Sequence, residues 1–262
     1  MISSLRLAYL SGLYGFRALF AWSSPGLFVV SLVVTPLLQV FFFVTLGNAF
    51  EYGSPSFFII GNAVQVAAAA GISGMVSVIA DERQAGTLAS VVGAPSSTTV
   101  VFAGRTLPGI VLGFVVSVFT AFVGFSLAGI SIPADRFGTF VLILAIAAFS
   151  CSALGVFLSA VGLLYRDIYQ IAGAAYLVLL VVSGANIVRD QLPAPLVLLG
   201  NLLPQANAID AARILISDGP IASVQFHLLW ELGVGAVWLL VALTGMKLLT
   251  SASRRRGTLE LY

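Results

Sequence analysis

Six long apolar runs constrain the fold more than any other feature of this sequence. They cover residues 27–46, 57–80, 106–130, 137–164, 168–187 and 226–249, and charged residues or proline and glycine clusters separate them. A helix needs about 20 mainly apolar residues to cross a bilayer. The runs are continuous, whereas spanning strands alternate apolar and polar residues, so helices are favoured over a β-barrel. The sequence therefore predicts an all-α membrane protein with six transmembrane helices.

Composition favours a single membrane domain over residues 1–262. Of the residues, 60% are hydrophobic and 8% are charged, and the mean hydropathy is +1.09, far from the values of a soluble domain. The longest stretch between the runs, residues 188–225, is too short and too apolar to form a core of its own. The net charge of +2 is too small to indicate a nucleic-acid partner.

The distribution of arginine and lysine predicts the orientation. Six spans place both termini on one side, and the side richer in these residues is cytoplasmic. The richer side holds Arg6, Arg17, Arg83, Arg105, Arg166, Lys247 and residues 254–256, whereas the other side holds Arg136, Arg189 and Arg213. We therefore expect both termini in the cytoplasm. As separate expectations, the protein is bacterial and its spans lie in the plasma membrane.

Residues 1–24 precede the first full span and lack the compact apolar core of a signal peptide. Arg6 and Arg17 are eleven residues apart, which at about 3.6 residues per turn returns them to nearly one helical face. This pattern predicts an interfacial helix on the cytoplasmic leaflet. The alternative is a frayed tail in which the two arginines only set the topology.

The outer segment 188–225 is apolar enough to re-enter the membrane, but prolines interrupt it. Pro193, Pro195, Pro204 and Pro220 divide it into short pieces. We expect two short re-entrant helices that dip into the outer half of the membrane, where irregular backbone is tolerated only against protein or a wet cavity.

Several kinds of catalytic site are missing from the sequence. The phosphate-binding motif G-x-x-x-x-G-K-[ST] needs a lysine, and the only one, Lys247, follows Met246. No spacing of histidine, cysteine or acidic residues indicates a metal, and Cys151 is a lone cysteine expected to serve packing. Residues 71–74 read GISG, as in rhomboid-type intramembrane proteases, but Ser73 lies too deep to meet His227, so the glycines are better explained by close helix packing.

Polar residues within the spans are candidates for a substrate path. They are Gln39, Asn62, Gln65, Gln170, Asn186 and Glu231. Interhelical hydrogen bonding is the alternative for the amides. Glu231 is the sharper candidate, because an ionisable group within a span is a functional hypothesis by default, but it lies near the outer boundary and a structural role remains equally open. The spans contain no chain of acids, so a proton- or sodium-driven pump lacks its usual relay.

Residues 81–105, DERQAGTLASVVGAPSSTTVVFAGR, form a charged and turn-rich island between the second and third runs. Such a loop can form a short helix parallel to the membrane that docks on a soluble partner. The alternative is a solvated loop whose Glu82 and Arg83 only mark its start and set the topology.

This island resembles the E-R-x-x-G-T-L…A-P segment that joins the second and third spans of ABC-2 type transporter permeases. The residues that match are Glu82, Arg83, Gly86, Thr87, Leu88, Ala94 and Pro95. Further similarities are Arg17, Pro25, PLLQ at 36–39, NLLPQAN at 201–207 with Asp210 and Arg213, and RRRGTLELY at 254–262. The outer stretch departs from the family pattern, because two leucines separate Asn201 from Pro204 and Gln205 replaces an aliphatic residue.

The resemblance implies a permease that is not itself an enzyme and holds no cofactor. Two ATP-binding subunits on the cytoplasmic face would bind ATP and Mg, and a second permease, identical or related, would complete the complex. Coupling to those subunits is expected through Asp81, Glu82, Arg83, Gly86, Thr87, Arg105, Arg6 and Arg17.

The spans carry few fixed charges, which suits a hydrophobic or amphipathic substrate. Export of a drug or antibiotic is the first expectation, and export of a lipid-linked polysaccharide is the alternative within the same mechanism. An ATP-independent channel or carrier is the alternative outside it. A carrier usually shows paired halves with broken helices, and no convincing internal repeat is visible here.

Overall fold

The computed structural model describes residues 4–21, 25–94, 98–165 and 167–256, and in these ranges it is helical without strands. The helices are α1 (Ser4–Ala21), α2 (Pro25–Ala49), α3 (Pro55–Gln84), α4 (Leu88–Gly93), α5 (Thr98–Leu127), α6 (Ala134–Val161), α7 (Ile168–Val182), the 3-10 helix η1 (Arg189–Gln191), α8 (Ala194–Leu202), α9 (Ala206–Ile216) and α10 (Ile221–Arg256). The all-α class predicted from the sequence therefore holds for the described residues.

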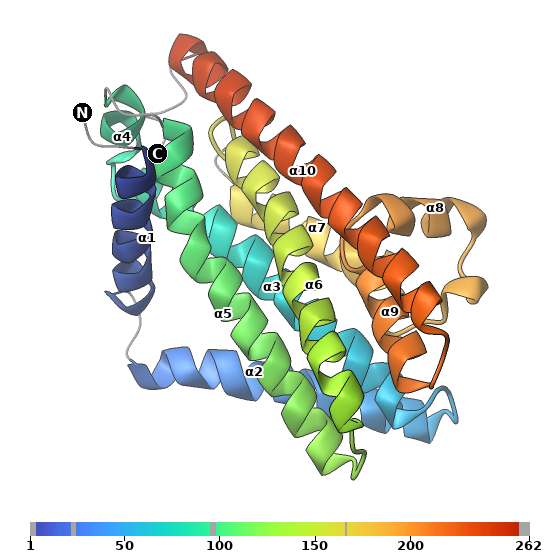
Figure 1. Ribbon diagram of the computed structural model, residues 1–262. Helices are drawn as coiled ribbons and strands as arrows, with labels where there is room; N and C mark the ends of the chain where they lie inside the picture. The colour runs from blue at the N-terminus through green and yellow to red at the C-terminus, as the bar shows by residue number, and fades with distance from the viewer. Residues whose placement is uncertain (1–3, 22–24, 95–97, 166, 257–262) are drawn as a thin grey trace.

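Four long helices, α3, α5, α6 and α10, form the central bundle (Figure 1). Among the described residues, these are the helices long and apolar enough to cross a membrane, over Pro55–Gln84, Val100–Leu127, Ala134–Val161 and Ile221–Ser253. They correspond to the second, third, fourth and sixth predicted spans. α3 and α6 are the most buried of the four, so they form the centre of the bundle and α10 forms one outer side.

Small residues allow the central helices to approach closely. A Cβ added at Gly155 of α6 would lie 2.7 Å from the carbonyl oxygen of Gly71 in α3, a distance that real Cβ atoms do not reach. A Cβ at Gly61 would lie 2.0 Å from the carbonyl oxygen of Ala185. Glycine is therefore required at both contacts, in keeping with the packing role expected of Gly71.

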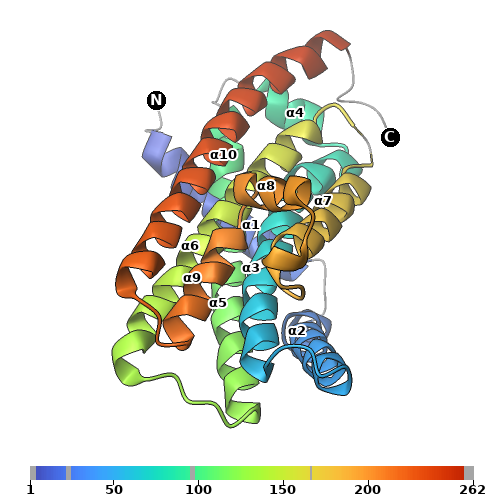
Figure 2. The same cartoon turned by 90° about the vertical axis from the view of Figure 1, so that its right-hand side faces the viewer.

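The first and fifth predicted spans fall in α2 and α7, which differ from the other four. The apolar stretch of α7, Ile168–Val182, is shorter than the usual span. α2 is 25 residues long, and within its described residues the apolar stretch is Val33–Ala49. Figures 1 and 2 show α2 lying across the bundle rather than along it. α7 ends at Val182 because the chain turns at Gly184, whose φ of +78° favours glycine. The predicted fifth span to residue 187 therefore includes a turn.

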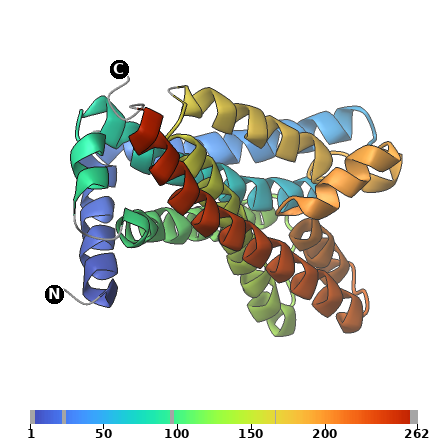
Figure 3. The ribbon, with the colours of Figure 1, turned by 90° about the horizontal axis from the view of Figure 1, so that it is seen from above.

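The two ends of the bundle carry different elements. The upper end in Figure 1 holds α4, the end of α3 and the last turns of α10. The lower end holds the connection 128–133 between α5 and α6 and the start of α3. α1 packs against the first half of α5 at this upper end (Figure 3). α1 covers residues 4–21 of the predicted N-terminal helix, and residues 1–3 and 22–24 lie outside the described residues.

The outer segment 188–225 contains two short helices, α8 and α9, joined by Leu203–Gln205. α9 packs on α10, α6 and α3, and its first turn contacts Gln65 and Glu231 through Gln205. Each of these contact residues lies ten positions after the start of its helix, at Pro55 and Ile221, which is about 15 Å along the axis. The α8–α9 connection therefore reaches roughly a third of the way along α3 from the lower end of the bundle.

Candidate functional site

The residues of the predicted coupling loop meet at the upper end of the bundle in a cluster that we call the coupling corner, comprising Asp81, Glu82, Arg83, Thr87 and Arg105. Glu82, in the last turn of α3, forms an ion pair with Arg105 of α5. The Thr87 hydroxyl lies 3.2 Å from the Glu82 carbonyl oxygen and also contacts the Glu82 carboxylate. Glu82 thus joins the turn after α3 to the start of α5.

Arg83 points into the protein rather than toward solvent. Only 7% of its surface is exposed, and its guanidinium donates to the carbonyl oxygens of Gly162 at 2.9 Å and Leu163 at 3.1 Å. These carbonyls follow the C-terminus of α6, where a cation is favourable. Its neighbour Asp81 accepts a hydrogen bond of 3.0 Å from the Tyr169 hydroxyl in α7. The end of α3 is therefore fastened to α5, to the α6–α7 connection and to α7.

The exposed part of the corner is the turn Gln84–Thr87. Gly86 has a φ of +69°, a conformation that permits the sharp turn into α4 and that other residues rarely adopt. Of the other predicted coupling residues, Arg6 is exposed on α1, and the side chain of Arg17 lies outside the described part of the structure. Pro95 of the motif also lies outside the described residues.

A second polar cluster, the buried joint, lies where α9 enters the bundle. Its members are Gln65, Ser150, Gln205 and Glu231. Glu231 of α10 is fully buried, and its carboxylate accepts hydrogen bonds from the Gln205 backbone N–H at 2.7 Å and from the Ser150 hydroxyl. The carboxylate thus caps the N-terminus of α9, the end of a helix that favours negative charge. A hydrogen-bond acceptor fixed at this point holds the short helix at its depth.

Gln205 completes the buried joint with its side chain. Its amide nitrogen donates to the Gln65 oxygen at 2.6 Å and to the Leu179 carbonyl oxygen at 3.2 Å. Its φ of 77° lies in the left-handed region, where a non-glycine residue is strained. Four helices, α3, α7, α9 and α10, therefore meet at one residue.

A chain of three amides lies nearer the lower end. The Gln39 amide of α2 donates to Asn62 of α3 at 2.9 Å, and the Asn62 amide donates to Asn186 at 2.8 Å and to the Phe58 carbonyl oxygen at 2.9 Å. The predicted path residues thus form two interhelical networks, and Gln170 lies apart from both, exposed in the first turn of α7. For the amides, the sequence left two roles open, a substrate path and interhelical hydrogen bonding, and the structure shows interhelical hydrogen bonds.

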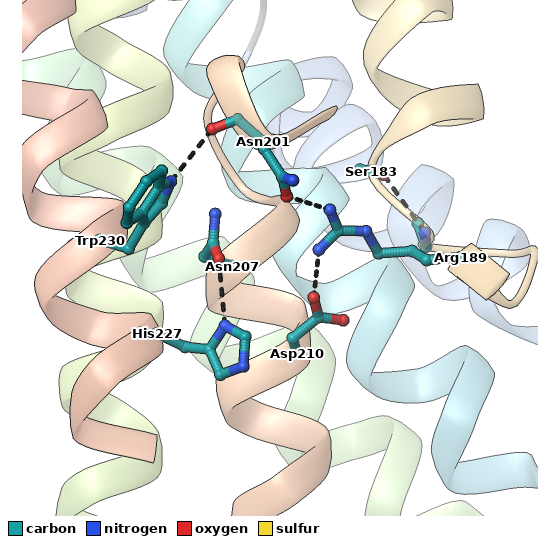
Figure 4. A network of polar contacts seen from close by, with 8 residues as sticks. Ser183, Arg189, Asn201, Asn207, Asp210, His227 and Trp230 are labelled. Atoms are coloured by element: carbon teal, nitrogen blue, oxygen red, sulfur yellow. Dashed lines mark hydrogen bonds and ion pairs between the residues drawn. The ribbon is translucent and has the colours of Figure 1, made fainter. Parts of the chain in front are cut away.

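A third network links the outer segment to α10 (Figure 4). Arg189 forms an ion pair with Asp210 and donates to the Asn201 side chain. The Trp230 indole donates to the Asn201 carbonyl oxygen at 3.2 Å. A further hydrogen bond, of 3.1 Å, joins His227 to Asn207.

Arg213 fastens the start of α3 to the turn after α7. It donates to the carbonyl oxygens of Phe57 at 3.2 Å and Ala185 at 3.0 Å, and it stacks 3.5 Å from the centre of the Phe57 ring. In the sequence, Arg189 counted only as an outer-face charge for topology, and Arg213 also belonged to the outer stretch that resembles the ABC-2 permeases. Their position in an otherwise apolar segment was the signal that they have buried partners.

A side cavity of about 630 Å³ lies between α2, α3, α5 and α7. Its lining carries no charged side chain. The polar groups come from Thr35, Gln39, Ser73, Tyr169 and Tyr176, and the rest of the wall is apolar. This cavity can hold an uncharged or weakly polar molecule of drug size.

Comparison with protein families decides the identity. The model of the ABC-2 type transporter family matches residues 14–216, most of the chain. The chain belongs to the ABC-2 type transporter family. No curated protein matches it.

This family membership confirms the resemblance drawn from the 81–105 motif. The matched range of this ABC-2 membrane domain contains the coupling corner, the side cavity and α8–α9, but ends before α10 and Glu231. An ABC-2 membrane domain is a permease component of a multi-pass membrane transporter, not the ATPase itself.

Proposed function

We propose that the chain is the permease subunit of an ABC exporter in the bacterial plasma membrane, driven by ATP that two separate subunits bind with Mg. The observation that carries this proposal is the coupling corner. A single turn, Gln84–Thr87, is exposed beside residues that connect inward to α5, α6 and α7. A partner that moves this turn would move the ends of those three helices together.

We assign different roles to the residues of the corner. The exposed turn with Gly86 and Thr87 meets the ATP-binding subunit, while Asp81, Glu82, Arg83 and Arg105 transmit its movement. Arg6 on α1 extends the contact surface along the cytoplasmic side. Closure of the ATP-binding subunits would then switch the bundle between two packed arrangements.

The surfaces of α2 and α7 support pairing with a second permease, identical or related. Both helices flank the side cavity and expose large apolar side chains, including Leu38 and Phe42 on α2 and Leu177 and Val181 on α7. A second permease against these faces would enclose the cavity, and the lipid bilayer would cover the remaining apolar surface.

The side cavity supports a hydrophobic or amphipathic substrate, such as a drug or antibiotic. Its wall is mostly apolar with scattered hydroxyl and amide groups. A lipid-linked polysaccharide, the alternative substrate, would need many hydrogen-bonding groups along its path, and the side cavity offers five polar residues. This observation favours efflux of a drug-like compound.

Co-expression with the ATP-binding subunit encoded beside this chain tests the proposal. A complex should purify intact, and its ATP hydrolysis should depend on the permease. A folded permease that neither associates with nor stimulates the ATP-binding subunit would contradict the proposal and favour an ATP-independent channel or carrier.

A further inference from the structure

A second cavity, distinct from the side cavity, lies beneath the coupling corner. It has a volume of about 430 Å³ and opens between α1, α3 and α5. We call it the corner cavity. Its lining includes Tyr14, Val78, Asp81, Glu82, Arg105 and Pro108.

The described lining of the corner cavity carries one more acidic than basic side chain. It contains two acids, Asp81 and Glu82, and one base, Arg105, which leaves one excess negative charge. Arg105 is paired with Glu82. Within the described part of the chain, the ion pairs do not include Asp81, and its hydrogen bond comes from the neutral Tyr169 hydroxyl.

The cavity lining also contains an aromatic side chain from α1. Tyr14 of α1 lines the cavity and is 64% exposed, so its ring is free to lie beside a ligand. The face of such a ring attracts a cation within about 6 Å. Val78, Pro108 and the glycines between these groups provide an apolar wall.

We propose that the corner cavity binds the ammonium group of an amphipathic amine. The Asp81 carboxylate accepts hydrogen bonds from the ammonium, the Tyr14 ring lies against the cation, and the apolar stem contacts Val78 and Pro108. A charge-assisted hydrogen bond to a half-buried carboxylate is stronger than a neutral one, so the amine is selected over an uncharged analogue.

This inference rests on the proposed function, because the amine is taken to be a transported substrate approaching from the cytoplasmic side. The same residues belong to the coupling corner. An amine in the corner cavity would therefore contact Asp81 directly. Through Asp81 it would affect the coupling corner, which connects the ATP-binding subunits to α3, α5 and α7.

Two fluorescent probes test the site. Monodansylcadaverine carries an ammonium at the end of a five-carbon chain, and N-pentyl dansylamide has the same skeleton without it. Their Kd values would be measured by fluorescence with the purified full-length chain in phosphatidylcholine nanodiscs. We expect the ammonium probe to bind more tightly, and Asp81→Asn to raise its Kd on the order of tenfold without changing the Kd of the neutral probe.

Matched variants separate the site from general effects. Asp81→Glu should keep most of the affinity, and Tyr14→Leu should weaken binding more than Tyr14→Phe, because only the ring faces the cation. Asp190→Asn and Tyr9→Leu alter exposed residues away from the cavity and should change nothing. Equal affinity for both probes, or unchanged binding in Asp81→Asn, would overturn the proposal.

A second measurement distinguishes a failure of the amine site from a failure of the proposed exporter function. In the complex with the ATP-binding subunits, the ammonium probe should raise ATP hydrolysis of the wild type, and Tyr14→Leu, which lies outside the coupling corner, should reduce that rise. If ATP hydrolysis depends on the permease but its rate does not change with the probe, the proposal of an amine substrate is contradicted and the proposed exporter function stands. If the probe binds but ATP hydrolysis does not depend on the permease, the proposed exporter function is contradicted and the proposed amine site stands.

Discussion

The Glu231 carboxylate and the Gln205 backbone N–H are 2.7 Å apart in the interior of the bundle. This hydrogen bond joins α10, a helix of spanning length, to a short helix that enters only from the lower end. Because Glu231 is fully buried, its carboxyl group meets the N-terminus of α9 and Ser150 rather than water. The pair explains how a proline-broken segment keeps a fixed depth.

Replacing Glu231 tests this role. Glu231→Gln keeps an oxygen that can accept from Gln205, so we expect a small loss of thermal stability. Glu231→Leu leaves the buried Gln205 N–H without its acceptor, at about 1–3 kcal/mol, while the Ser150 hydroxyl keeps the Ala147 carbonyl oxygen. This change should lower the Tm of the purified chain clearly. Leu229→Ala, at an exposed position of the same helix, is the control. A wild-type Tm for Glu231→Leu would contradict the role.

The strained backbone at Gln205 makes a second prediction. Gln205→Ala loses both side-chain hydrogen bonds and keeps a non-glycine residue at a φ of 77°. Gln205→Gly loses the same bonds but relieves the strain, which costs about 1–3 kcal/mol. Thermal denaturation should therefore rank the glycine variant above the alanine variant. The opposite ranking would show that the backbone at this position is not strained in solution.

Close packing of α3 and α6 makes a third prediction. Gly155→Ala introduces a Cβ 2.7 Å from the Gly71 carbonyl oxygen, so the helices must separate, and overpacking of this kind costs about 1–3 kcal/mol. Gly233→Ala is the matched control, because nothing lies within 4 Å of the added atom in α10. Denaturation of both variants should show a loss of stability at 155 and none at 233. Equal changes in both variants would mean that helix propensity, and not the contact between α3 and α6, determines the change in stability.

The ion pair between Glu82 and Arg105 makes a prediction about coupling. Glu82→Arg and Arg105→Glu should each lower permease-stimulated ATP hydrolysis, because each places like charges together at the coupling corner. The double variant restores opposite charges and should recover part of the rate. Membrane insertion, followed by the amount of folded protein, should be unchanged in all three. If the double variant folds well but its permease-stimulated ATP hydrolysis does not recover, then coupling depends on the individual residues and not on their ion pair.

Arg83 shows where sequence reasoning reached its limit. Its place in the 81–105 motif was visible, but a charged residue at the start of a loop suggests exposure. The structure instead turns its guanidinium toward Gly162 and Leu163, far along the chain. Nothing local in the sequence marks those carbonyls as its partners, because their availability follows from where α6 ends.

The helices of the central bundle were predictable for a physical reason. α3, α5, α6 and α10 are long and continuously apolar, so length and composition identify them. α2 and α7 were predicted as full spans, but their placement depends on packing, on Pro36 within α2 and on the turn at Gly184. The buried joint was only partly predictable from the sequence. Gln65 and Glu231 were identified as polar residues within spans, but their contacts with Gln205 depend on how deeply α9 lies in the bundle.

ATP-dependent uptake into inside-out vesicles tests the central claim most directly. The vesicles would hold this chain with its ATP-binding subunits, and the probe would be a fluorescent amphipathic compound. The account predicts that the compound accumulates with ATP and Mg, and that a non-hydrolysable analogue, or omission of either subunit, abolishes accumulation. Uptake by this chain alone, at the same rate with and without ATP, would contradict the account and identify an ATP-independent channel or carrier.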